Sequence, residues 1–199
     1  MPHHNPDTPR APRRADAERS RTAILTAATR VLGAQHDAGL DDIAKAAGVS
    51  RQTVYAHFTS RETLINAVFD HVTEGVVAAM DAAMNETVDG EPAETTLIRL
   101  LSASSHVADQ LPIVLRDQPL TSERAHELHR PIVERFAEVI ERGQRSGEFS
   151  DRLSCHWLVA AIIALVHTAA DEVDSGRMTA NDAEAALRIS LRKLTLPTQ

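Results

Sequence analysis

Hydrophobic residues in the first third of the chain recur at intervals of three and four, which is the spacing of one face of a helix. This pattern predicts a first helix over about residues 16–35. Its apolar face consists of Ile24, Leu25, Ala28, Val31 and Leu32. Because such a face has to be buried against other elements, the segment predicts the beginning of a helical core.

Two short helices are expected next, over residues 40–47 and 51–57. Gly48 between them can adopt the left-handed conformation that ends a helix. Ser50 can accept a free amide proton at the start of the second helix. The inward side of the turn and of the second helix is apolar and consists of Val49, Val54 and Phe58. The two helices are therefore expected to pack around a tight turn.

The rest of the chain is predicted to form further helices. Ser60 is the expected cap of a fourth helix that reaches Met84. Further helical segments are expected over residues 93–110, 112–119, 122–145, 154–175 and 179–194. Pro131 either kinks its helix or begins the main body of it. Aromatic residues, which strands favour, make up only 3% of the chain. The prediction is an all-α fold of about nine helices.

Composition narrows the class of protein further. With 43% hydrophobic residues the chain can build a core. Its single cysteine, Cys155, excludes an intrachain disulfide and a thiolate zinc site, so a reducing cytoplasm is expected. The N-terminal residues lack the apolar segment of a secretory signal. The longest unbroken apolar run, Trp157 to Val166, is shorter than the roughly 20 residues of a membrane span, so a soluble protein is predicted.

The net charge of −7 is unevenly distributed, with +1 on residues 1–70 and −8 on residues 71–199. A surface that faces phosphate groups is therefore expected in the first third of the chain. Residues 1–15 contain four prolines and no hydrophobic periodicity, and we expect a disordered arm there. Its arginines, at positions 10, 13 and 14, belong either to a solvated tail or to an arm that contacts DNA phosphates.

The outer side of the 51–57 helix is polar. It is formed by Arg51, Gln52, Thr53, Tyr55 and His57, with Ser50 and Arg61 at its two ends. Arginine can bond guanine through two donors, and glutamine can bond adenine in the same way. Hydroxyl groups, imidazole and a second arginine suit phosphate oxygens. Two short helices around a tight turn, the second with such a face, are typical of a helix-turn-helix that enters the major groove.

An ordinary helical hairpin with a solvated polar face is the alternative, but the surrounding sequence disfavours it. The stretch DIAKAAGVSRQTVYAHFTSRETLINAVF begins at Asp42. The segment from Arg21 to Val72 resembles the DNA-binding domain of the TetR (tetracycline repressor) family, most specifically between Gly48 and Leu64. The resemblance implies dimers of all-helical subunits, with three N-terminal helices on double-stranded DNA and a larger effector-binding domain. It also implies that the polar residues of the 51–57 helix face DNA.

Two features depart from the family pattern. Arg61 stands where the family commonly has lysine, which preserves a phosphate contact but not its geometry. Gly39 and Asp41 stand where the family often has a threonine cap and sometimes a basic residue, which removes the support for a phosphate contact there. Beyond Val72 the resemblance concerns the architecture alone.

We expect three parts: a disordered arm (1–15), a helix-turn-helix domain (16–60) and an effector-binding and dimerisation domain (61–199). The apolar surplus on Trp157 to Val166 exceeds what one subunit covers, so the last two helices predict a homodimer through a four-helix bundle. A buried core helix in a monomer is the alternative. A dimer would place two recognition helices on half-sites about 34–36 Å apart in a pseudo-palindromic operator.

An effector pocket is expected, from the resemblance, among the fourth to eighth helices. Its candidate lining residues are Leu101, Ser105, Leu111, Leu115, Phe136, Ile140, Trp157, Ala161 and His167. Each of them also fits a plain core position. The mostly apolar lining suits a hydrophobic or aromatic effector, which Ser105 or His167 could orient.

An enzyme is the main rival class. His126 and His129 resemble half of a zinc-protease motif, but that motif needs histidines four apart. They share a helix face, so adventitious metal binding is an alternative, while no catalytic residue, cofactor or dedicated metal site is expected. Cys155 and His156 are adjacent in a helix and point apart, so a structural cysteine is predicted.

The sequence therefore predicts a ligand-responsive transcriptional repressor. A homodimer binds the operator through its helix-turn-helix and is released by a small, hydrophobic effector, with the fourth helix as the lever between the two domains. A DNA-binding activator or a ligand-independent regulator is the alternative.

Overall fold

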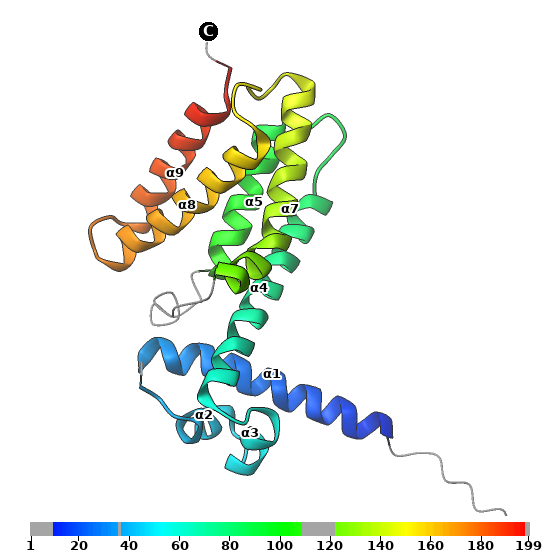
Figure 1. The fold of residues 1–199 in the computed structure, drawn as a ribbon, viewed down its shortest axis with the longest axis vertical. Helices are drawn as coiled ribbons and strands as arrows, with labels where there is room; N and C mark the ends of the chain where they lie inside the picture. The colour runs from blue at the N-terminus through cyan, green and yellow to red at the C-terminus, as the bar shows by residue number, and fades with distance from the viewer. Residues whose placement is uncertain (1–9, 36, 109–121, 198–199) are drawn as a thin grey trace, which may run out of the picture.

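The computed structural model describes residues 10–35, 37–108 and 122–197, and regular structure within these ranges is helical (Figure 1). The helices are α1 (Arg10–Ala34), α2 (Leu40–Ala47), α3 (Arg51–His57), α4 (Arg61–Asn85), α5 (Ala93–Ala108), α7 (Ser122–Ser146), α8 (Cys155–Asp174) and α9 (Ala180–Thr195). The helices α1 to α3 form one group, and α5 and α7 to α9 form a second. The all-α prediction is confirmed, while the segment predicted over 112–119 lies outside the described residues.

Helix boundaries agree with the predicted ones where a cap residue marks them. α2 and α3 have the predicted bounds, and Gly48 between them is left-handed, with φ of 67°. The hydroxyl of Ser50 accepts a hydrogen bond from the amide of Thr53 at 3.0 Å, and that of Ser60 accepts one from Thr63 at 3.1 Å. These caps satisfy amide groups that a helix leaves without partners. Because serine is a preferred residue for this role, the sequence located the beginnings of α3 and α4.

The prediction for the start of the chain is wrong in part. α1 begins at Arg10, so residues 10–15 are helical rather than part of a disordered arm. Pro12 lies in the first turn, where a missing N–H removes no intrahelical hydrogen bond. Proline therefore did not exclude a helix here. Residues 1–9 of the expected arm lie outside the described part of the chain.

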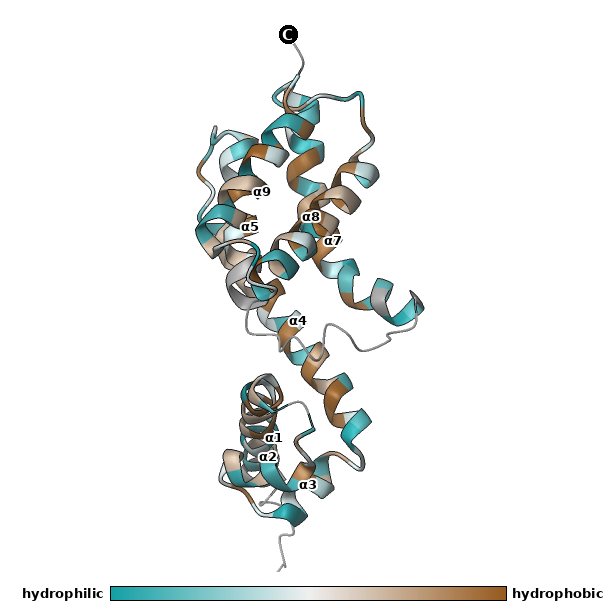
Figure 2. Cartoon of the chain, turned by 90° about the vertical axis from the view of Figure 1, so that its left-hand side faces the viewer, coloured by the Kyte–Doolittle hydropathy of each residue, from teal (hydrophilic) through white to brown (hydrophobic). Residues whose placement is uncertain are grey.

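The first group of helices shares a core with the beginning of α4. Buried side chains of this core are Ile24, Leu25, Ala28, Leu32, Leu40, Ile43, Val54, Phe58, Leu64, Ile65, Val68 and Phe69. Leu128 of α7 also belongs to it. The first turns of α4, which follow the predicted domain boundary at residue 60, therefore supply part of the core on which the helix-turn-helix rests. Figure 2 shows hydrophobic residues along α4 as it passes from one group to the other.

The second group has its own core and a polar brace beside it. The core includes Met80, Leu97, Phe136, Ile140 and Leu158. At its edge the guanidinium of Arg99 donates to both carboxylate oxygens of Glu91, at 2.8 and 2.6 Å, and to the carbonyl of Ala83 at 2.9 Å. The end of α4, the following loop and α5 are thereby tied together.

The Glu91 brace makes stability depend on pH. The hydrogen bonds from Arg99 and then from the Thr96 hydroxyl lower the pKa of Glu91 from its ordinary 4.5 to about 2. A lowered pKa in the folded state stabilises the fold above about pH 4.5, and this contribution is lost as pH falls towards 2. We expect the difference in unfolding free energy between the protein and Glu91→Gln to shrink across this window, as urea titrations would show. A constant difference would contradict the assignment.

Gly143 allows α7 to approach the chain that follows it. A Cβ at this position would lie 2.3 Å from Cδ2 of Phe149, whose ring is buried. We expect Gly143→Ala to lower the unfolding free energy by about 2 kcal/mol, because so short a contact favours the upper end of the overpacking cost of about 1–3 kcal/mol, while the gain in helix propensity is at most about 1 kcal/mol. Urea unfolding at fixed protein concentration measures this. Adding Phe149→Leu should recover part of the loss, and a variant as stable as the parent would contradict the contact.

Helix α8 is apolar on several sides, but only one of its sides is buried in this chain. Leu158, Val159 and Ile162 are buried, whereas the Trp157 side chain is 60% exposed and Ala160 and Ala164 are exposed. Within the described residues, α8 is long and apolar enough to cross a membrane by length and composition alone, and 17% of its most apolar window is buried. In α9, Ile189 is likewise 57% exposed. The two helices thus present uncovered apolar surface.

Candidate nucleic-acid interface

The helix-turn-helix lies at one end of the molecule (Figure 1), and apolar side chains anchor α3 on its inner side. Val54 and Phe58 are buried in the first core, as predicted. On the opposite side, the Arg51 and Tyr55 side chains are 66% and 42% exposed, and Gln52 is exposed as well. The face therefore presents a guanidinium, an amide and a phenol on a short, anchored helix.

The other predicted interface residues are partly engaged within the chain. The Ser50 and Thr53 hydroxyl oxygens lie 2.8 Å apart at the start of α3, where they hold the helix cap. The His57 ring is half-buried, with its centroid 6.1 Å from that of Phe58. Arg61 is half-buried, and its Nε donates to the carbonyl of Ala38 at 3.4 Å. These four residues therefore lie at the margins of the exposed face.

Arg51 is held by two residues in a way that the sequence analysis missed. Its Nη1 donates to Oδ2 of Asp41 at 2.7 Å, and its Nη2 to the Tyr55 hydroxyl at 3.4 Å. The guanidinium also lies over the Tyr55 ring, 5.3 Å from the centroid. The hydrogen bond to Tyr55 and the charge of Asp41 raise the pKa of Arg51. The spacing of four residues signals the Tyr55 contact, but the Asp41 contact depends on how α2 crosses α3.

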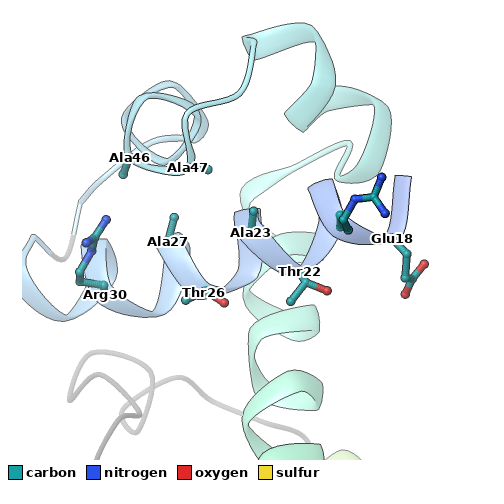
Figure 3. A pocket seen from close by; sticks show the side chains of 9 residues that line it. Glu18, Thr22, Ala23, Thr26, Ala27, Arg30, Ala46 and Ala47 are labelled. Carbon is teal, nitrogen blue, oxygen red and sulfur yellow. The ribbon is translucent and has the colours of Figure 1, made fainter. Parts of the chain in front are cut away.

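A hollow of about 740 Å³ lies between α1 and α2 (Figure 3). Small side chains face one another across it, from Ala23 and Ala27 of α1 and from Ala46 and Ala47 of α2. Arg30 lies at one end, with Glu18 towards the other. The hollow is open to solvent and lies in the first group of helices, away from the predicted effector site.

The predicted effector-pocket residues do not all come together. Leu101, Phe136 and Ile140 are buried in the second core, and Ala161 is half-buried. Trp157 and His167 are exposed in this chain, so their place in an effector pocket stays a prediction. Leu111 and Leu115 lie outside the described residues, as does the side chain of Ser105.

Two arginines of α7 connect it to α4. Arg124 donates to Asp70 of α4, and Arg135 donates to both carboxylate oxygens of Asp81, at 2.6 and 2.8 Å. The Arg135 hydrogen bonds lower the pKa of Asp81. Since Leu128 also joins the first core, α7 contacts the part of α4 that supports the helix-turn-helix. The two groups of helices are thus linked through α7 as well as through the α4 backbone.

The residues that raised rival interpretations occupy ordinary structural positions. The Cys155 thiol is half-buried and donates to the carbonyl of Ala137 at 3.7 Å, and burial raises its pKa. A raised pKa disfavours the reactive thiolate. His129 of α7 packs edge-on against His167 of α8, with ring centroids 5.5 Å apart. Among the described residues, no group of three or more potential metal ligands is found.

Comparison with known proteins agrees with this geometry. The family model "Bacterial regulatory proteins, tetR family" matches residues 24–68, which cover the first core from α1 into α4. The chain is 40% identical over 98 residues to the HTH-type transcriptional repressor LfrR of Mycolicibacterium smegmatis, and 35% identical over 78 residues to the HTH-type transcriptional activator FasR of the same organism. These matches cover 49% of this chain and of LfrR, and 38% of this chain and 36% of FasR.

The similarity of structure extends further than that of sequence. The crystal structure of LfrR in complex with proflavine has a TM-score of 0.70, with 29% identity, over 92% of this chain and 99% of that one. A TetR-family structure from Rhodococcus, 20% identical, shows the same fold with a TM-score of 0.71 over 88% of this chain and 98% of that one. The curated relatives are named as transcriptional regulators, which favours a regulator over the enzyme alternative. Residues 24–68 thus match the TetR family of bacterial regulatory proteins, and the chain as a whole has the fold of TetR-family structures.

Proposed function

We propose that the protein is a repressor that binds a pseudo-palindromic DNA operator through α3. The observation that carries this proposal is the exposed polar face of α3, opposite its buried anchors Val54 and Phe58. Arg51 and Gln52 would contact base edges, while Tyr55, His57 and Arg61 would contact phosphates and set the register. The hydroxyl of Ser50 caps the helix start beside that of Thr53, and both would lie beside the same phosphates. Repression is proposed because LfrR is named a repressor, and activation remains the alternative because FasR is named an activator.

The proposed functional unit is a homodimer formed through α8 and α9. The exposed Trp157, Ala160 and Ala164 follow one another at helical spacing along α8, and Ile189 adds to the apolar surface on α9. Burying this surface against its two-fold copy would complete a four-helix bundle. The same pairing would place two α3 helices on half-sites about one helical turn of DNA apart.

The proposed effector is a small hydrophobic or aromatic molecule that binds among α4, α5, α7 and α8. LfrR has been crystallised with proflavine, which is an aromatic compound. The proposed site of this chain adjoins Leu101, Phe136 and Ile140, which offer apolar contacts. Binding would release DNA by favouring a dimer whose two α3 helices no longer match the groove spacing. α4 would transmit the change, together with the contacts that Arg124 and Leu128 of α7 make near its beginning.

Selection of bound fragments from a randomised duplex library tests this function. The account predicts enrichment of one sequence with two related half-sites, and loss of its binding when a hydrophobic aromatic probe such as proflavine is added. Enrichment without any two-fold symmetry would contradict the dimeric mode, and no enrichment would contradict DNA recognition. In the source organism, deletion should raise the transcript of a gene beside the selected site, whereas a fall would identify an activator.

A further inference from the structure

We propose that Asp41 is a positioning residue for Arg51, which sharpens the discrimination between specific and nonspecific DNA while lowering the affinity for both. This inference rests on the proposed function of α3. The observation behind it is the bond between an acidic side chain at the start of α2 and the most exposed arginine of the proposed reading face, across 2.7 Å. Asp41 and Arg51 come from different helices, so the turn at Gly48 brings them together.

The contacts fix the guanidinium from two directions. Asp41 accepts from Nη1, while the Tyr55 hydroxyl accepts from Nη2 and the Tyr55 ring lies beneath the guanidinium. The second carboxylate oxygen of Asp41, Oδ1, is buried and has no hydrogen-bond partner within the described residues. One oxygen of the Asp41 carboxylate thus binds Arg51, and the other is shielded from solvent.

This arrangement affects the two modes of DNA binding differently. Nonspecific affinity comes from contacts between basic side chains and phosphates, for which a mobile arginine is well suited. A base contact needs one defined orientation of the guanidinium, and a side chain ordered beforehand loses less freedom when it forms. Asp41 opposes a movement of the Arg51 side chain towards the phosphates. The negative charge of Asp41 also repels the phosphates. The carboxylate therefore disfavours nonspecific binding more than specific binding.

A contribution to folding stability explains the ion pair between Asp41 and Arg51 less well than a role in DNA binding does. The Arg51 side chain is 66% exposed and that of Asp41 is 47% exposed, and an ion pair that solvent reaches in this way contributes little to folding because solvent screens it. Removing the charge of Asp41 should therefore leave the fold intact. We therefore expect the ion pair to affect DNA binding, in which Arg51 contacts the bases.

The test compares Asp41→Asn with Glu62→Gln, which removes the same charge from an exposed position in the first turn of α4. Each full-length variant is titrated with the duplex that the parent enriches from a randomised library and with a shuffled duplex of the same composition. For Asp41→Asn we expect about tenfold tighter binding to the shuffled duplex, a salt dependence steeper by about one ion per subunit, and a severalfold lower ratio of the two affinities. Glu62→Gln should shift both affinities together and leave the ratio unchanged.

The outcomes separate this inference from the function beneath it. An unchanged ratio for Asp41→Asn, with a parent that selects one duplex, would overturn the positioning role and leave the DNA-binding function standing. A parent that selects no duplex would overturn both. Asp41→Ala, which removes both carboxylate oxygens, should lower the ratio in the same direction, and thermal melting checks that each variant is folded.

Discussion

Replacing Arg51 with alanine is expected to weaken binding to the selected duplex by about 30-fold or more, because each two-donor contact to a base contributes about 1–3 kcal/mol and a dimer makes two of them. The side chain is exposed, and its described contacts are to Asp41 and Tyr55, so neither core loses a group. Tyr55→Ala should act in the same direction, since it removes the ring and hydroxyl that hold Arg51. Fluorescence anisotropy with labelled duplex measures the loss.

The control for this prediction is Arg145→Ala. Arg145 is an exposed arginine in the last turn of α7, remote in sequence from the helix-turn-helix, and its replacement changes the net charge equally. It should leave duplex affinity within about threefold of the parent, as expected for a change of charge far from the DNA. Size-exclusion chromatography should show dimers for every variant. An Arg51→Ala protein that binds as tightly as the parent would remove α3 from the interface.

Trp157→Asp is expected to convert the dimer to monomers and to abolish binding to the full operator. Buried tryptophans at the centres of interfaces contribute about 2 kcal/mol or more when truncated, and a two-fold interface contains the change twice. An aspartate at this position would also bury two negative charges in the interface, one from each subunit, without partners of opposite charge. Sedimentation at micromolar concentrations measures the association, and the same sample is then titrated with duplex.

Val88→Asp provides the matched control, because Val88 is also a large, exposed apolar residue but lies in the loop between α4 and α5. It should leave the dimer and its affinity for DNA intact. If Trp157→Asp remains dimeric while its melting temperature is unchanged, the dimer uses another surface. A parent protein that is monomeric at all concentrations would contradict the four-helix bundle itself.

Local chemistry explains how much of the fold the sequence could predict. α2 and α3 were placed correctly because Gly48 and Ser50 each act on the adjacent turn. The core of the first group followed from the spacing of residues such as Ile24 and Leu32 along one helix face. Signals of this kind extend over about four residues, which is the range of the interactions that produce them.

What the sequence did not reveal depends on contacts between distant segments. The packing of Leu64 and Phe69 under the helix-turn-helix and the contact of Asp41 with Arg51 both depend on the angles at which helices cross. The exposure of Trp157 could not be predicted either, because an apolar helix does not show which of its faces the chain covers. At the start of the chain, proline suggested disorder although the first turn of α1 accommodates it.

The most direct test of the account is the affinity of the purified parent protein for the selected and the shuffled duplex, measured over a series of salt concentrations. Recognition through α3 predicts a preference for the selected duplex at every concentration, with the logarithm of affinity falling linearly with that of salt. Equal affinity for both duplexes, or binding that salt does not weaken, would contradict the central claim that the exposed face of α3 reads DNA.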